Sequence, residues 1–285
     1  MKIKYLLPIL CLSIVAVSCS GSDDNDGPQE PVEANYYPSE ASNTWFYNVE
    51  NESTTNPEVN FSESDLVTIA SSNGGSFTID VNNDAAPSYG LMNSILNTGT
   101  ITRGASTLSL NGSLPIPLEL DGLTTTDIVL SNFVLYDLNV GNNSQLAATN
   151  GVINETVNVD GTDIPLTATY TITNTRRSDL NSLTVDGESF SNVIVTDIVL
   201  NLEITATVNV LGNPTTQTLL VAQDVLTIRN YFAQDVGLIK SEADQSYELN
   251  QELITLLELG GLTIDFPTEL SVSNTQDLDS YSVGN

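Results

Sequence analysis

The strongest constraint on the fold is an alternating pattern in residues 198–210, which read IVLNLEITATVNV. Successive side chains of an extended strand point to opposite faces, so this pattern predicts a long antiparallel strand with one buried and one solvent-facing side. Val193 and Val195 have the opposite parity, which predicts a β-bulge near Thr196 and Asp197. The apolar side chains that share one face are Ile198, Leu200, Leu202, Ile204, Ala206, Val208 and Val210.

The same alternation recurs along the chain, with turn dipeptides between the segments. Residues 77–82, 107–110, 166–173 and 216–230 read as further strands. Helical spacing is confined to two short segments, residues 88–97 and 249–258. We therefore predict a mainly β fold, a large curved antiparallel sheet (half-barrel or sandwich) of roughly ten to twelve strands with one or two short helices. The turn dipeptides are Asn73-Gly74, Asn111-Gly112, Asp160-Gly161 and Asp186-Gly187.

The first 18 residues have the features of a secretory signal. Lys2 and Lys4 precede an apolar run over residues 5–17. That run is about 13 residues long, shorter than the roughly 20 that a membrane-spanning helix needs. The following Ala16-Val17-Ser18-Cys19 resembles a bacterial lipobox, which implies cleavage before Cys19 and attachment of acyl chains to its thiol.

Residues 19–35 read as a disordered acidic tether, because they are small, polar and interrupted by proline. Asp23, Asp24 and Asp26 resemble the surface-export signal of Bacteroidetes-type lipoproteins, which implies a protein anchored in the outer membrane and facing outward. We assign residues 36–285 to a single β-rich domain, and a division within residues 175–185 is the alternative.

Composition narrows the chemistry. The chain has 36 acidic and 7 basic residues and a formal charge of −29, which disfavours nucleic acid as a partner. It has no histidine, which excludes histidine-based nucleophiles and the usual zinc sites. Of its two cysteines, Cys11 would be removed with the signal and Cys19 would be acylated, so no free thiol is expected in the mature domain. We predict no cofactor, no metal, no catalytic residue and a monomer. Calcium binding by oxygen-rich loops stays an alternative.

A second informative segment is YFAQDVGLIKSE, residues 231–242. Its Lys240 is the only lysine outside the first 18 residues. The segment predicts a hairpin in which Tyr231, Phe232, Gly237 and Lys240 form a candidate site. In one interpretation Lys240 lays its alkyl stem along apolar surface and pairs with Glu242 or Asp244. In the other, it lies at the mouth of a cavity and meets the anionic head of a ligand.

Three segments carry a further resemblance to exported bacterial β-proteins. They are Tyr36-Tyr37-Pro38 with Trp45-Phe46-Tyr47, residues 185–193, and the hairpin at residues 231–242. Some such proteins are similar to the LolA/LolB lipoprotein carriers, in which a strongly curved sheet wraps a helix and shelters acyl chains. The resemblance implies a carrier-like fold and no catalytic residues.

From these features we expect a non-enzymatic, lipid-anchored lipoprotein of the cell surface. It would bind an apolar or lipid-like ligand or serve the structure of the envelope, with the membrane as its partner through Cys19. A glycan- or protein-binding surface module is the alternative. A glycoside hydrolase with two carboxylates is a third interpretation, since carboxylates are the one catalytic group in good supply.

Overall fold

The computed structural model describes residues 35–116, 127–159, 161–210, 213–259 and 267–284. Residues 33–285 form one compact unit. Cys19, Asp23, Asp24 and Asp26 lie outside the described residues, so the predicted anchor and export signal stay predictions. Within the described part of the chain, the helices are too short or too polar to cross a membrane.

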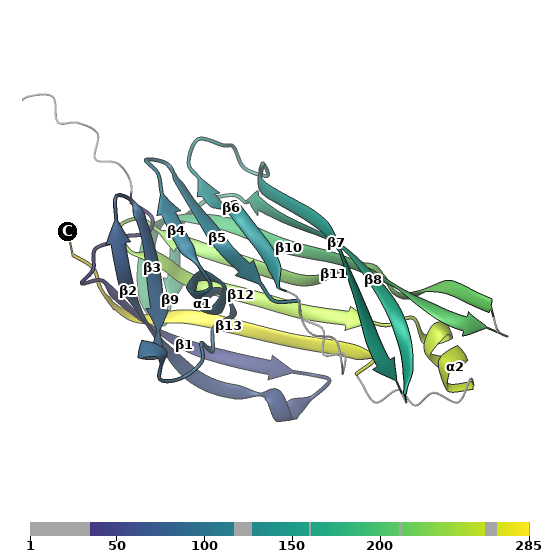
Figure 1. Cartoon of the computed structure of the whole chain (residues 1–285). Coiled ribbons are helices and arrows are strands. Elements are labelled where there is room, and N and C mark those ends of the chain that lie inside the picture. Colours follow the sequence, from purple (N-terminus) through teal and green to yellow (C-terminus); the bar gives the residue numbers. More distant parts are fainter. Residues whose placement is uncertain (1–34, 117–126, 160, 211–212, 260–266, 285) are drawn as a thin grey trace, which may run out of the picture. The chain divides into compact units, whose positions relative to one another are not determined.

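Within these described ranges thirteen strands form one antiparallel sheet, in the order β6-β5-β4-β3-β2-β1-β13-β12-β11-β10-β8-β7, with β9 paired to β10 (Figure 1). The mainly β prediction is confirmed. The strands are β1 (Thr44–Ser53), β2 (Phe61–Asn73), β3 (Ser76–Val81), β4 (Thr100–Arg103), β5 (Thr107–Leu114), β6 (Ile128–Asp137), β7 (Gln145–Val159), β8 (Thr162–Arg176), β9 (Leu180–Val185), β10 (Glu188–Val210), β11 (Asn213–Ala233), β12 (Gly237–Glu248) and β13 (Glu269–Ser282).

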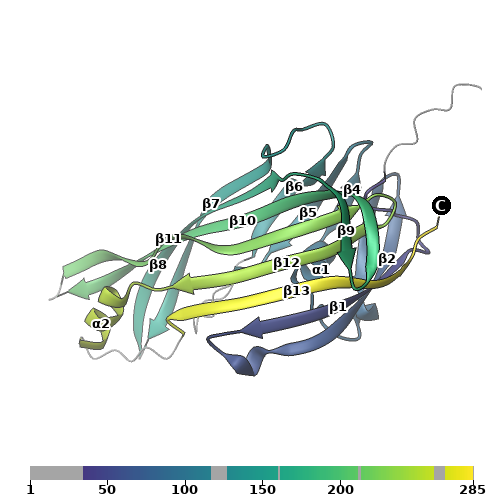
Figure 2. The same ribbon diagram turned by 180° about the vertical axis from the view of Figure 1, so that it is seen from behind.

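The sheet curves until its two ends approach each other, as Figures 1 and 2 show from opposite sides. Side chains of β8 bridge the gap to β6. The Asn174 amide donates to the carbonyls of Val134 and Leu135 at 2.7 and 2.9 Å. Arg176 donates to the carbonyls of Asp137, the last residue of β6, and of Val140 beyond that strand. A single curved sheet, and not a sandwich of two, is therefore the form that the fold takes.

The predicted bulge near Thr196 and Asp197 was wrong. The pairing of β10 with β11 runs without a register shift from Val193 opposite Ala233 to Leu200 opposite Leu226, and the shifts begin only at Leu200/Asn201. Residues 193–198 are all buried, so both faces of β10 are covered there. Apolar residues on both parities consequently need no change of register.

Both predicted helices are confirmed, as α1 (Leu91–Asn97) and α2 (Gln251–Leu259), and two short 3-10 turns are η1 (Pro57–Val59) and η2 (Asn82–Asp84). Helix α1 contacts β3 and β5 as well as β12 and β13, so it lies inside the curve of the sheet. Its Met92, Ile95 and Leu96 side chains are fully buried there. This helix fills the space between the facing strands.

Candidate functional site

Residues 231–242 form the hairpin that joins β11 to β12. Phe232 points inward and is fully buried. Tyr231 and Lys240 are cross-strand partners on the outer face. Gly237 has a φ of +115°, in the region that favours glycine, and a Cβ there would lie 3.4 Å from the Trp45 indole nitrogen. The four residues of the candidate site therefore divide between two faces of the sheet.

The first strand holds this hairpin in place. The Trp45 indole N–H donates to the Val236 carbonyl at 2.7 Å, and the Tyr47 hydroxyl donates to the Leu238 carbonyl at 2.8 Å. Both bonds are buried, and they join residues 191 positions apart. The aromatic segment near the start of the domain and the hairpin near its end, which carry the carrier resemblance, thus meet in space.

The third segment of that resemblance, the turn between β9 and β10, lies against the same part of the molecule. Asn48 of β1 donates to Asp186 at 3.2 Å, and Tyr281 of β13 donates to Glu188 at 3.4 Å. The Phe190 and Tyr281 rings are 6.2 Å apart. Figure 2 shows β9 folded back in front of the sheet. This hairpin helps to cover the outer face where β10 is buried on both sides.

Lys240 is held between two carboxylates on the outer face. Its Nζ lies 2.8 Å from Asp277 and 3.3 Å from Glu242. Burial alone would lower the pKa of Lys240, but its hydrogen bond to Asp277 and the charge of that carboxylate hold the pKa above its ordinary value. Of the two partners suggested by the sequence, Glu242 makes the contact; Asp277, on the neighbouring strand, makes the shorter one.

Tyr231 completes this group by donating its hydroxyl to Glu242 at 2.9 Å. Burial, together with the hydrogen bond to Glu242, raises the pKa of Tyr231 to about 12. The phenol therefore stays protonated at neutral pH and acts as a donor. Glu242 and Asp277 both contact the Lys240 ammonium, so Tyr231, Glu242, Lys240 and Asp277 form one connected polar group on the outer face.

A second ion cluster lies beside the first and was not predicted. Asp197 of β10 is 2% exposed, and it accepts a paired contact from Arg229 at 2.8 and 2.8 Å and one from Arg177 Nε at 2.7 Å. Burial would raise the pKa of Asp197, but the hydrogen bonds from Arg229 and Arg177 outweigh this and lower it. Sequence carried one hint, the adjacent cations Arg176 and Arg177.

Strand register joins the two clusters into one surface, which we call the outer charged row. Asp197 is opposite Arg229, Arg229 is opposite Glu242, and Lys240 is opposite Asp277. Apart from Lys2 and Lys4, the sequence has only five cationic side chains, and this row contains three of them. The row consists of Arg177, Asp197, Arg229, Tyr231, Glu242, Lys240 and Asp277.

The opposite face of the same strands carries an inner polar row, made of Thr196, Asn230, Ser241 and Gln276. Each is the cross-strand partner of the next, and all are buried. Ser241 donates to Asn230, and Gln276 donates to Asn93 of α1 at 2.9 Å. Thr196 Oγ1 and Asn230 Nδ2 have no hydrogen-bond partner among the described residues.

A buried carboxylate beside this row anchors α1. Asp65 of β2 is fully buried, and its hydrogen-bond donors among the described residues are neutral. They are the backbone N–H groups of Tyr89 and Gly90 and the side chains of Ser88, Asn82 and Asn93, at 2.9 to 3.1 Å. A Cβ at Gly90 would clash with the Gln276 amide, so a larger residue there would displace this buried side chain. This hydrogen-bond network has a structural role, because it holds the start of α1 against β2.

Aromatic side chains fill the interior at the hairpin end. Tyr136 packs edge-on against Phe232 with ring centres 5.3 Å apart, and Tyr37 packs between Trp45 and Phe77 at 5.5 and 5.4 Å. An apolar ligand in this part of the sheet would have to displace them or α1. The hairpin side chains Tyr231 and Lys240 face away from this interior.

An open hollow of about 530 Å³ lies at the other end, where β11 approaches α2. Its polar groups bond to one another: Gln223 donates to the Glu248 carbonyl and accepts from the Glu248 N–H, and Asn250 donates to the Thr218 carbonyl. The side chains of Gln223 and Asn250 are therefore already engaged in holding β11 against the start of α2. It is lined by Val221, Ala222, Gln223, Glu248, Leu249, Asn250, Gln251 and Glu252.

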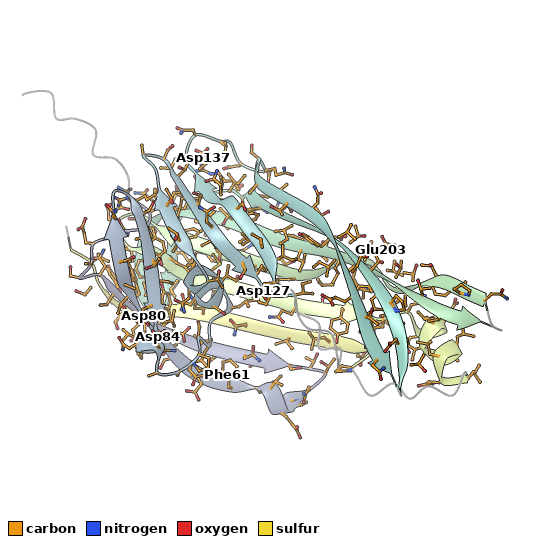
Figure 3. The ribbon with its side chains drawn as sticks, viewed as in Figure 1. Phe61, Asp80, Asp84, Asp127, Asp137 and Glu203 are labelled. Atoms are coloured by element: carbon orange, nitrogen blue, oxygen red, sulfur yellow. The ribbon has the colours of Figure 1, made fainter. Side chains whose placement is uncertain are left out.

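Most of the labelled carboxylates in Figure 3 lie apart: Asp127, Asp137 and Glu203 come from separate parts of the molecule. Asp80 and Asp84 are neighbours, and the Asp84 backbone N–H donates to Asp80 at 3.2 Å. Within the ranges that the structure describes, no three acidic, histidine or cysteine side chains gather so as to hold a metal ion.

Comparison of the chain with protein-family models, curated proteins and solved structures gave no match. The case for function therefore rests on the residues themselves.

Proposed function

We propose that this chain is a lipid-anchored protein of the bacterial cell surface that binds its ligand without catalysing a reaction. The anchoring part of the proposal is supported by the lipobox-like sequence ending in Cys19 and by the acidic residues that follow it. The binding part is supported by the contrast between the two faces of the sheet.

The observation that carries the binding proposal is the gathering of cations on the outer face of β10, β11 and β12. Arg177 and Arg229 have side chains that are 41% and 48% exposed, while Asp197 between them is buried. The inner face at the same level is closed by α1 and aromatic side chains. A glycan or protein partner approaching from solvent would meet the outer charged row first.

An apolar or lipid-like ligand is the second candidate, and α2 favours it. Leu256 and Leu259 are 43% and 83% exposed on this helix, whose Leu253 and Leu257 side chains are buried in the continuous apolar core. Movement of α2 away from β11 would expose the apolar side chains that α2 now covers. Acyl chains are the class of ligand that such a surface takes.

Anchoring and display are tested in the native host by labelling with a palmitate analogue and by adding protease to intact cells. The wild-type chain should take up label and be cut from outside, and Cys19→Ala should do neither. Label on the Cys19→Ala variant, or full protection of the wild type from protease, would contradict the proposal.

The ligand class is tested by native mass spectrometry of the lipidated protein purified from the host envelope. A reproducible added mass that organic solvent extracts would support the apolar ligand. A mass equal to the acylated polypeptide alone would leave the outer face as the binding surface.

A further inference from the structure

We propose that Arg177 and Arg229 form a binding site for a compact oxyanion, meaning a carboxylate, sulfate or phosphate group carried on an otherwise neutral molecule. The site deepens the proposed function and rests on it, because it specifies the chemistry that the outer face recognises. Asp197 is the residue that positions the two arginines.

The geometry brings two guanidinium groups together. Arg177 Nε and Arg229 Nη2 contact the same carboxylate oxygen of Asp197, at 2.7 and 2.8 Å. Arg229 adds a second contact through Nε, so its planar group is fixed by two parallel bonds. Since Asp197 is buried within the sheet and both arginine side chains are about half exposed, the two groups are held at the surface with limited freedom.

Donor capacity is left over after these contacts. A guanidinium has five N–H donors, and Arg177 uses its Nε for Asp197. Within the described ranges its two Nη atoms donate to no other group. Paired arginines with free N–H groups match the oxygen pairs of carboxylate, sulfate and phosphate. The site thus has donors, rigidity and access from solvent.

Charge balance points the same way. Two cations share one carboxylate, so the cluster has a net charge of about +1, and the two like charges repel each other at this separation. Over the whole row three cations meet three carboxylates, and the positive excess is local to the arginine end. A compact anion would be attracted to that end.

The surroundings restrict the size of the anion. Glu242 lies on the next strand opposite Arg229, and Asp277 lies one strand further. Screening at physiological salt acts over about 8 Å, so these acids act on any charge that extends along the row. A single oxyanion on a neutral body fits between them, whereas a polyanion would be repelled.

The test is calorimetric titration of the purified lipidated protein, in neutral detergent at low salt, with glucuronate, glucose 6-phosphate and glucose 6-sulfate. Glucose is the neutral control and inorganic phosphate is the bare anion. We expect saturable binding of at least one of the three anionic sugars, no binding of glucose, and weakening that rises with salt. Binding of inorganic phosphate as well would show that the oxyanion itself is recognised.

The matched variants are Arg177→Gln, Arg229→Gln and Arg103→Gln, which change net charge equally. Arg177→Gln and Arg229→Gln should each weaken binding at least ten-fold, and Arg103→Gln on β4 should change it less than two-fold. Thermal melts would establish that all three fold. Equal weakening by all three variants, equal binding of glucose, or no saturable binding by the wild type would overturn the site. Surface display of Arg177→Gln tests the proposed function separately, because anchoring does not need the arginines.

Discussion

The inner polar row and the outer charged row lie on the same strands, one residue apart. Thr196 and Asp197 are adjacent, as are Arg229 and Asn230, and Ser241 and Glu242. The inward member of each pair is a neutral hydroxyl or amide, and the outward member is charged. Removing a charge from water costs far more than removing a hydroxyl or amide. Charges therefore lie on the outer face, where they can pair with partly exposed cations, and the inner face at this level carries neutral groups.

The inward carboxylate of Asp65 shows what burial of a charge requires. Asp65 is fully buried, and five neutral donors surround it. Asp197, on the outer face, is instead matched by two cations. The two buried acids differ in role: Asp65 fixes a helix, and Asp197 fixes two exposed arginines. Changing each in turn tests this difference.

Asp65→Ala should have the largest effect. It leaves the buried donors of Tyr89, Gly90 and Asn93 without an acceptor, so we expect a loss of about 3 kcal/mol or more in the free energy of unfolding. Urea unfolding measures it. The matched exposed change, Asp244→Ala, should stay within about 0.5 kcal/mol. A loss of less than 1 kcal/mol for Asp65→Ala would contradict the anchoring role.

Asp197→Ala should have a smaller effect, because both arginines can turn into solvent. We expect a loss of about 1–2 kcal/mol at pH 7. Since the folded pKa of Asp197 is lowered, its contribution is complete above the unfolded pKa of about 3.9 and is lost as pH falls through the folded pKa.

Unfolding of the wild type and the variant between pH 2 and 7 would show this pH dependence. The two stabilities should converge at the acid end of the range. A difference that is constant with pH would mean that charge pairing is not the cause.

Thr196→Val tests the inner row. The Thr196 hydroxyl is buried and lacks a partner among the described residues, so its replacement by an isosteric methyl should stabilise the fold by up to about 1 kcal/mol. Thermal unfolding compared with Thr205→Val, at a less buried position of the same strand, measures the change. A loss of 1 kcal/mol or more would instead reveal a water molecule bonded to this hydroxyl.

Lys240→Gln should have the smallest effect. The ion pairs of Lys240 are partly exposed, so we expect a loss below about 1 kcal/mol that shrinks further as salt is added. Equilibrium unfolding at low and high salt measures it, with Arg103→Gln as the control of equal charge. A larger, salt-independent loss would place Lys240 with Asp65 among the structural residues.

The sequence predicted where the strands and helices lie better than it predicted which elements pack against them. The alternation in residues 198–210 and 216–230 identified β10 and β11, and leucine spacing identified α2. The bulge at Thr196 failed because parity was read as if one face were exposed, whereas both faces of β10 are buried there. The alternation shows which side chains of a strand are apolar, but it does not show whether another part of the chain covers the second face of that strand.

The candidate site was predictable only in part, for a related reason. The hairpin of residues 231–242 follows from its turn residues, since Asp235 has a positive φ and Gly237 does too. The nearest partner of Lys240 is Asp277, 37 residues later, and those of Asp197 are 20 residues earlier and 32 later. Such pairs depend on strand order across the sheet, on which local spacing carries no information.

Pairing of β1 with β13 has a consequence for the order of events in folding. Thr44 lies opposite Ser282, so one edge of β1 pairs with a strand that is more than 200 residues away in the sequence. Trp45 and Tyr47 likewise bond to hairpin carbonyls 191 residues away. Contacts of this sequence separation form late and slowly. The middle of the sheet is therefore the part that we expect to close last when the chain folds.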